Sequence, residues 1–73
     1  MKESIKKLDK SLNERMYKYR NSLEFCKQKA EEFKKKNNPV YETIFKNQIE
    51  VLRARIEELE HVLKGLDKVL SNE

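Results

Sequence analysis

Apolar residues recur through the first half of the chain at intervals of three and four residues. This stripe comprises Ile5, Leu8, Leu12, Met16, Tyr19, Leu23, Cys26, Ala30 and Phe33. Such spacing places every member on one face of an α-helix. Because no Gly or Pro interrupts it, the pattern predicts one helix over about residues 3–36. At about 1.5 Å per residue, that helix is about 50 Å long.

The second half carries a longer apolar face. Its main stripe is Tyr41, Phe45, Ile49, Leu52, Ile56, Leu59, Leu63, Leu66 and Leu70. After the first step the intervals alternate between three and four, which is typical of a heptad seam and predicts a helix over about residues 39–70. A second row, comprising Val40, Ile44, Val51, Val62 and Val69, lies about 90–100° to one side. Together they occupy about half the circumference, so we expect at least two neighbouring helices.

The residues between the two stripes are typical of a tight connection. Lys34–Lys36 place cations at the negative end of the first helix dipole. Asn37 suits the left-handed conformation that ends many helices. Asn38 and Pro39 suit the N-cap and the first position of a new helix. A turn of only residues 37–38 makes the two helices antiparallel neighbours.

These elements predict an all-α fold, an antiparallel two-helix hairpin of coiled-coil type that occupies residues 1–73 as a single unit. A core in so short a chain contributes only about 3–5 kcal/mol. We therefore expect a homodimeric four-helix bundle or a higher assembly. The predicted self-association residues are Ile44, Val51, Val62 and Val69.

The composition argues against catalysis and metal binding. One cysteine and one histidine are too few for a zinc site. Glu58 and His61 match the Glu-x-x-His motif of di-metal bundles, but both point away from the main stripe. Cys26 lies on the apolar stripe with no histidine on its helix, which indicates a small apolar side chain. We expect no enzyme, no metal and no cofactor.

The chain shows neither a secretory signal at its start nor an apolar run long enough to span a membrane, so we expect a cytoplasmic protein. Its charge is uneven. Residues 1–36 carry 12 Lys and Arg against 6 Asp and Glu, whereas residues 37–73 carry 5 against 7. A basic half of this kind attracts acidic membranes or nucleic acids. The candidate anion-binding residues are Lys6, Lys7, Lys10, Lys34, Lys35 and Lys36.

Two aromatic residues lie off the apolar stripe of the first half. Tyr17 and Phe25 are separated by two helical turns and by about 80° around the helix. Exposed aromatic residues often anchor protein interfaces, although single ones are common on any surface. Both interpretations stay open, and Tyr17 and Phe25 are the candidate contact with a specific protein partner.

The stretch IFKNQIEVLR, from Ile44 to Arg53, resembles the start of the second core helix of the ESCRT-III family. The matching positions are Ile44, Phe45, Asn47, Ile49, Leu52 and Arg53, and further on Leu66, Asp67 and Val69. Gln48 and Val51 stand where the family pattern has acidic residues. The resemblance also includes a short basic turn after a basic first helix. It implies hairpins that assemble side by side into filaments and bind acidic membranes through their first helix.

Three functional hypotheses follow. The leading one is a non-enzymatic, self-associating hairpin, which the resemblance extends to a polymer on acidic membranes. The second is a small basic protein bound to nucleic acid or to a ribonucleoprotein. The third is a regulator or inhibitor that docks one specific protein through Tyr17 and Phe25.

Overall fold

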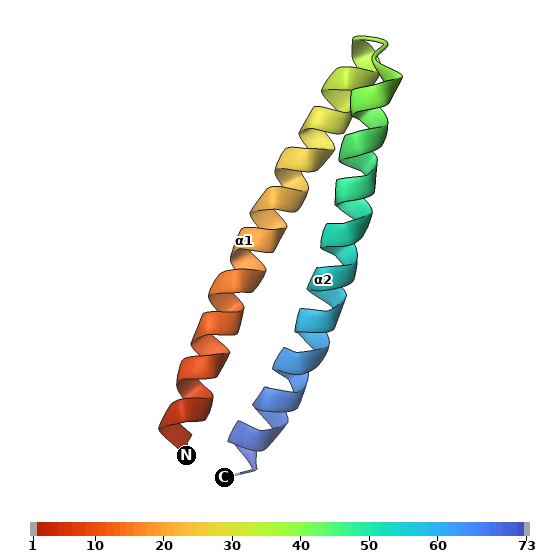
Figure 1. Cartoon of the computed structure of the whole chain (residues 1–73). Coiled ribbons are helices and arrows are strands. Elements are labelled where there is room, and N and C mark those ends of the chain that lie inside the picture. Colours follow the sequence, from red (N-terminus) through yellow and green to blue (C-terminus); the bar gives the residue numbers. More distant parts are fainter. Residues whose placement is uncertain (1, 73) are drawn as a thin grey trace.

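The computed structural model describes residues 2–72 and confirms an all-α hairpin (Figure 1). Helix α1 spans Lys2–Lys35 and helix α2 spans Pro39–Ser71, and no strand occurs in the described range. The observed bounds lie within one residue of those expected, with Lys36 in the turn instead of in the first helix. The two helices lie side by side along a rod that measures 55 × 15 × 13 Å.

The connection between the helices satisfies the backbone at both helix ends. Asn37 has a positive φ of 56°, as predicted for the residue that ends α1. Its N–H donates to the carbonyl of Lys34, and the N–H of Asn38 donates to the carbonyl of Phe33, which is the Schellman arrangement. Asn38 also caps α2, because its side-chain oxygen accepts from the N–H of Tyr41 at 3.3 Å. One residue therefore closes one helix and opens the next.

The core is a single layer of side chains between the helices. It has two clusters, one of Leu12, Met16, Ile56 and Leu59 and one of Cys26, Ala30 and Ile49. Their members are 7–9% exposed, and none of the described side chains is below 2%. Since neither helix is covered on its outer side, this layer is the whole core that one chain can form. The thinness of the core agrees with the small stability expected for a chain of this length.

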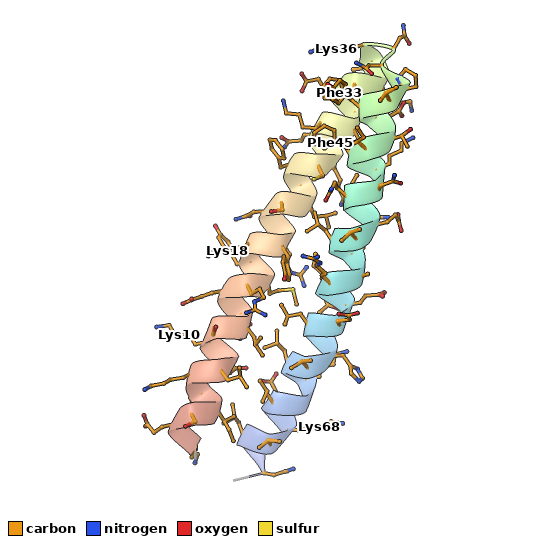
Figure 2. The ribbon with its side chains drawn as sticks, in the orientation of Figure 1. Lys10, Lys18, Phe33, Lys36, Phe45 and Lys68 are labelled. Atoms are coloured by element: carbon orange, nitrogen blue, oxygen red, sulfur yellow. The ribbon has the colours of Figure 1, made fainter. Side chains whose placement is uncertain are left out.

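Aromatic rings fill the end of the hairpin next to the turn. Phe33 stacks on Tyr41 at 5.1 Å and on Phe45 at 5.7 Å between ring centroids (Figure 2). Stacked and edge-on ring pairs contribute about 0.5–1.5 kcal/mol each beyond their burial. Two members of the predicted apolar stripes, Leu8 and Tyr41, are about half exposed. Tyr41 covers Phe33 with one ring face and leaves the rest of its side chain to solvent.

Candidate interaction surfaces

A row of apolar side chains on α2 is exposed along the length of the hairpin. Ile44, Val51, Val62 and Val69 have exposed fractions of 46–48%, and Val40 reaches 66%. We call Ile44, Val51, Val62 and Val69 the α2 apolar row. Their near-equal exposure over more than three heptads shows that α1 covers none of them preferentially. The sequence pattern predicted this second row, and the structure leaves it open to solvent.

The α2 apolar row lies along one flank of the hairpin. Near its middle, Val62 lines a groove together with Arg15 and Tyr19 of α1 and Arg55 and Glu58 of α2. On a helical wheel for antiparallel helices, Phe25 of α1 falls on this same flank. The opposite flank carries an ion pair between the helices, in which Arg20 Nη2 lies 2.8 Å from Glu60 Oε1. One flank is therefore apolar with charged residues at its centre, and on the other flank an ion pair joins the two helices.

The two candidate aromatic contacts have different surroundings. Tyr17 is 68% exposed, lies in a shallow hollow beside Lys10 and Glu14 and stacks on no ring within the described chain. Phe25 instead packs edge-on against Phe45 at 6.4 Å, with Lys29 Nζ 5.7 Å from its ring centroid. Phe25 therefore touches α2 while more than half of it stays exposed, and it does not line the hollow beside Tyr17.

The candidate anion-binding lysines form two groups at opposite ends of the rod. Lys10 projects from the open end, where Lys6 and Lys7 also lie, and Lys36 projects from the turn (Figure 2). Lys36 is paired with Glu32 at 2.9 Å and lies 5.7 Å from the Phe33 ring. The remaining candidates, Lys6, Lys7, Lys10, Lys34 and Lys35, form no ion pair with any residue in the range 2–72.

Glu32 is held between two lysines near the turn. Its carboxylate accepts a hydrogen bond from Lys36 at 2.9 Å and another from Lys29 at 3.2 Å. These hydrogen bonds, and the charges of the same two lysines, lower the pKa of Glu32 below the ordinary value of 4.5. The arrangement neutralises part of the charge at the turn, so fewer cations there are available to a ligand.

The pKa of Glu32 sets the sign of a pH effect on the turn. Because the folded pKa is lowered, the stabilisation is present above the ordinary pKa and is lost as the pH falls through the folded value. Carboxyl-detected NMR titration should place the Glu32 midpoint below 4.5, and Lys36→Gln should raise it. A Glu32 midpoint unmoved by the substitution would contradict the assigned cause.

The groups considered for chemistry are dispersed. Glu58 and His61 are exposed, and Cys26 is buried between the helices. Among the described residues no cluster of His, Cys, Asp and Glu could hold a metal ion. Neither helix, over residues 2–72, is apolar enough to cross a membrane. The features with the most organised geometry are therefore the α2 apolar row and the charges beside it.

Sequence reasoning missed two features of these surfaces. The Arg20–Glu60 ion pair joins residues 40 positions apart, a contact that the spacing within either helix does not indicate. The position of Phe25 on the inter-helix contact was also missed, because it depends on how far each helix is rotated about its axis.

Comparison with protein-family models, with curated proteins and with solved structures gives no significant match to this chain.

Proposed function

We propose that this hairpin is a non-enzymatic interaction protein that works by associating with further copies of itself. The observation that carries the proposal is the α2 apolar row, whose side chains are 46–48% exposed along one flank of the hairpin. Apolar residues that gather on one exposed face mark an interaction site more often than singly scattered ones do. The row runs parallel to the core, so a second elongated hairpin fits it better than a compact ligand does.

Association would also enlarge the apolar core, which in the single chain is one thin layer. Covering the exposed half of a valine or isoleucine side chain contributes about 1 kcal/mol. A row that is covered in both copies therefore adds a second apolar layer beside the thin core between α1 and α2. Such a layer gives the outer flank of each hairpin a partner, and it offsets part of the entropy lost on association.

Light scattering across a range of protein concentration and salt tests the proposal. We expect the mass to rise from 8.8 kDa for one chain towards a plateau at twice that value. The plateau should persist at high salt, because apolar burial is not screened as surface charge is. A mass that stays at one chain throughout the range would overturn the proposal.

The same measurement separates a closed dimer from an open polymer. The ESCRT-III resemblance of Ile44–Arg53 supports a filament, in which the mass grows with concentration and reaches no plateau. A two-fold dimer covers the α2 apolar row in both copies, so no third copy can add through that flank. A filament needs a second, different surface on each hairpin. The polar flank that carries Arg20 and Glu60 would then have to supply it.

Binding to acidic membranes is a second proposed activity, and the unpaired lysines at both ends of the rod support it. Each lysine close to an anionic bilayer contributes about 1 kcal/mol. Changing Lys34, Lys35 and Lys36 to Gln should weaken binding to phosphatidylserine vesicles, measured by co-sedimentation, at least about thirtyfold, since the two unpaired lysines alone contribute about 2 kcal/mol. Helicity should be unchanged. Phosphatidylcholine vesicles are the control for charge. Equal binding by both proteins would show that the turn takes no part.

Nucleic acid is the competing ligand for the same lysines. Backbone-driven binding predicts a gel shift of DNA or RNA that weakens steeply with salt. A shift on nucleic acid without binding to acidic vesicles would replace the membrane proposal. The proposal that a specific protein docks at Tyr17 and Phe25 is weakened by the packing of Phe25 against Phe45, and alanine at both positions tests it.

A further inference from the structure

The α2 apolar row occupies four of the eight positions of a second heptad seam on α2, and the other four are polar or glycine. The residues along this line are Ile44, Gln48, Val51, Arg55, Glu58, Val62, Gly65 and Val69. Their spacings alternate as 4, 3, 4, 3, 4, 3 and 4, which is the a and d pattern of a coiled-coil helix. This seam is separate from the one that α2 presents to α1 through Ile49, Ile56 and Leu59. Helix α2 therefore has a second face with heptad spacing, which α1 leaves exposed.

The second seam has mirror symmetry in its residue types. About a centre between positions 56 and 57, Ile44 is matched by Val69, Val51 by Val62, Gln48 by Gly65 and Arg55 by Glu58. Every apolar position is matched by an apolar one. In an antiparallel pair of helices, each a residue lies opposite a d residue of the partner. Each residue of this seam would therefore face its symmetry match on the other helix.

We propose that a second copy of this chain docks α2 against α2 in antiparallel orientation, with a two-fold axis between positions 56 and 57. This inference rests on the proposed self-association and specifies its geometry. The contact is isologous, since each matched pair occurs twice. The apolar pairs Ile44–Val69 and Val51–Val62 form the layers on either side of the axis, and Arg55 of each copy faces Glu58 of the other.

The charges at the centre of the seam select this orientation. Arg55 and Glu58 lie one helical turn apart and both line the central groove, yet neither forms an ion pair within residues 2–72. In an antiparallel dimer, Arg55 of each copy faces Glu58 of the other copy, so all four charges have an opposite charge as partner. A parallel partner in register places Arg55 against Arg55 and Glu58 against Glu58, which repel. Charge complementarity thus favours a second copy in one orientation only.

Gly65 is consistent with the same register. It is the only glycine of the chain, it lies inside α2, and no atom lies within 4 Å of the position that a Cβ would occupy. Glycine at such a site lowers helix stability by about 1 kcal/mol relative to alanine, and nothing within the hairpin requires it. In the proposed dimer it faces Gln48, and the missing side chain leaves room for the glutamine.

Disulfide trapping tests the register directly. In a Cys26→Ala background, a Val51→Cys chain is mixed with a Val62→Cys chain of different tag length, and the mixture is oxidised mildly. Positions 51 and 62 face each other in the proposed dimer. Two copies of position 51 are instead separated by about 16 Å along the axis, beyond the reach of a disulfide. We expect the mixed disulfide to exceed either self-linked product at least about fivefold.

Each alternative result has a distinct meaning. Efficient self-linking of the Val51→Cys chain would overturn the antiparallel register while leaving self-association intact. Failure of the mixture to cross-link, although the unmodified protein reaches dimer mass by light scattering, would also overturn the register. A protein that stays at one chain in light scattering would instead remove the proposed function on which the inference rests.

Charge reversal provides a second, independent test. Arg55→Glu alone and Glu58→Arg alone each place like charges opposite one another at both central layers. We expect each to weaken the dimer roughly tenfold, and the double variant to recover to within about threefold of the original. In a parallel dimer residue 55 faces residue 55 and residue 58 faces residue 58. Like charges then meet in the original chain and in all three variants, so all would associate alike. Failure of the double variant to recover would therefore overturn the inference.

Discussion

Replacing Ile56 with Ala should leave the isolated hairpin largely unfolded. Ile56 is 8% exposed and packs in the cluster that contains Leu12, Met16 and Leu59. Loss of a buried isoleucine to alanine costs about 2–5 kcal/mol, against a total of about 3–5 kcal/mol for a core of this size. The far-UV circular dichroism of Ile56→Ala at low protein concentration should therefore show most of the helical signal lost at room temperature.

The matched control is Ile44→Ala, the same change in chemistry at a half-exposed position of the same helix. Under conditions where the single hairpin dominates, this variant should lose only about 1 kcal/mol of stability, since about half of the side chain is already exposed. Raising the protein concentration should restore some helix to Ile56→Ala, because association stabilises the folded chain by mass action. Equal losses of helix in the two variants would show that the observed core is not what holds the hairpin together.

Placing aspartate at both Val51 and Val62 should abolish self-association. In the proposed dimer these residues face each other in two layers, so the double variant buries four carboxylates close to one another. Burial of charge without a partner costs several kcal/mol, and the dimer should weaken at least about a hundredfold. Sedimentation equilibrium of Val51→Asp/Val62→Asp should give the mass of one chain at concentrations where the original protein is dimeric.

The same change of charge can be made on another face of α2. Arg53→Gln/Lys64→Gln also lowers the net charge by two, at exposed residues of α2 that lie about 150–170° around the helix from the α2 apolar row. This control should associate like the original chain. If both double variants lose the dimer equally, net charge and not the row governs association. If neither loses it, the interface lies elsewhere on the hairpin.

The helices and the turn were predictable because their causes are local. The alternation of three and four residues places Ile49, Ile56 and Leu59 on one face whatever they pack against. Likewise, the Asn37-Asn38-Pro39 sequence has few alternatives to ending one helix and starting another. The structure confirms the left-handed Asn37 and the Asn38 cap. Both features depend on the backbone within a few residues of the turn.

Features that depend on the rotation of one helix against the other were not predictable from spacing. Phe25 lies well off the stripe of α1, yet its long side chain reaches Phe45. Arg20 reaches across to Glu60 because the two residues are on the same flank, a relation that no single-helix pattern contains. The exposed α2 apolar row was predicted as a surface. The proposed pairing of this row with a second copy could be argued only once the structure showed which face of α2 is covered by α1.

The rod shape of the hairpin has a consequence for small-angle X-ray scattering. The radius of gyration is 16.5 Å and arises mostly from the 55 Å length. A second hairpin laid alongside at the 8–10 Å spacing of packed helices doubles the forward scattering but raises the radius of gyration by only about 1 Å. Joining two rods end to end would roughly double it, as the mass then lies about one rod length apart. Lateral association should therefore thicken the particle's cross-section and leave its longest dimension almost unchanged.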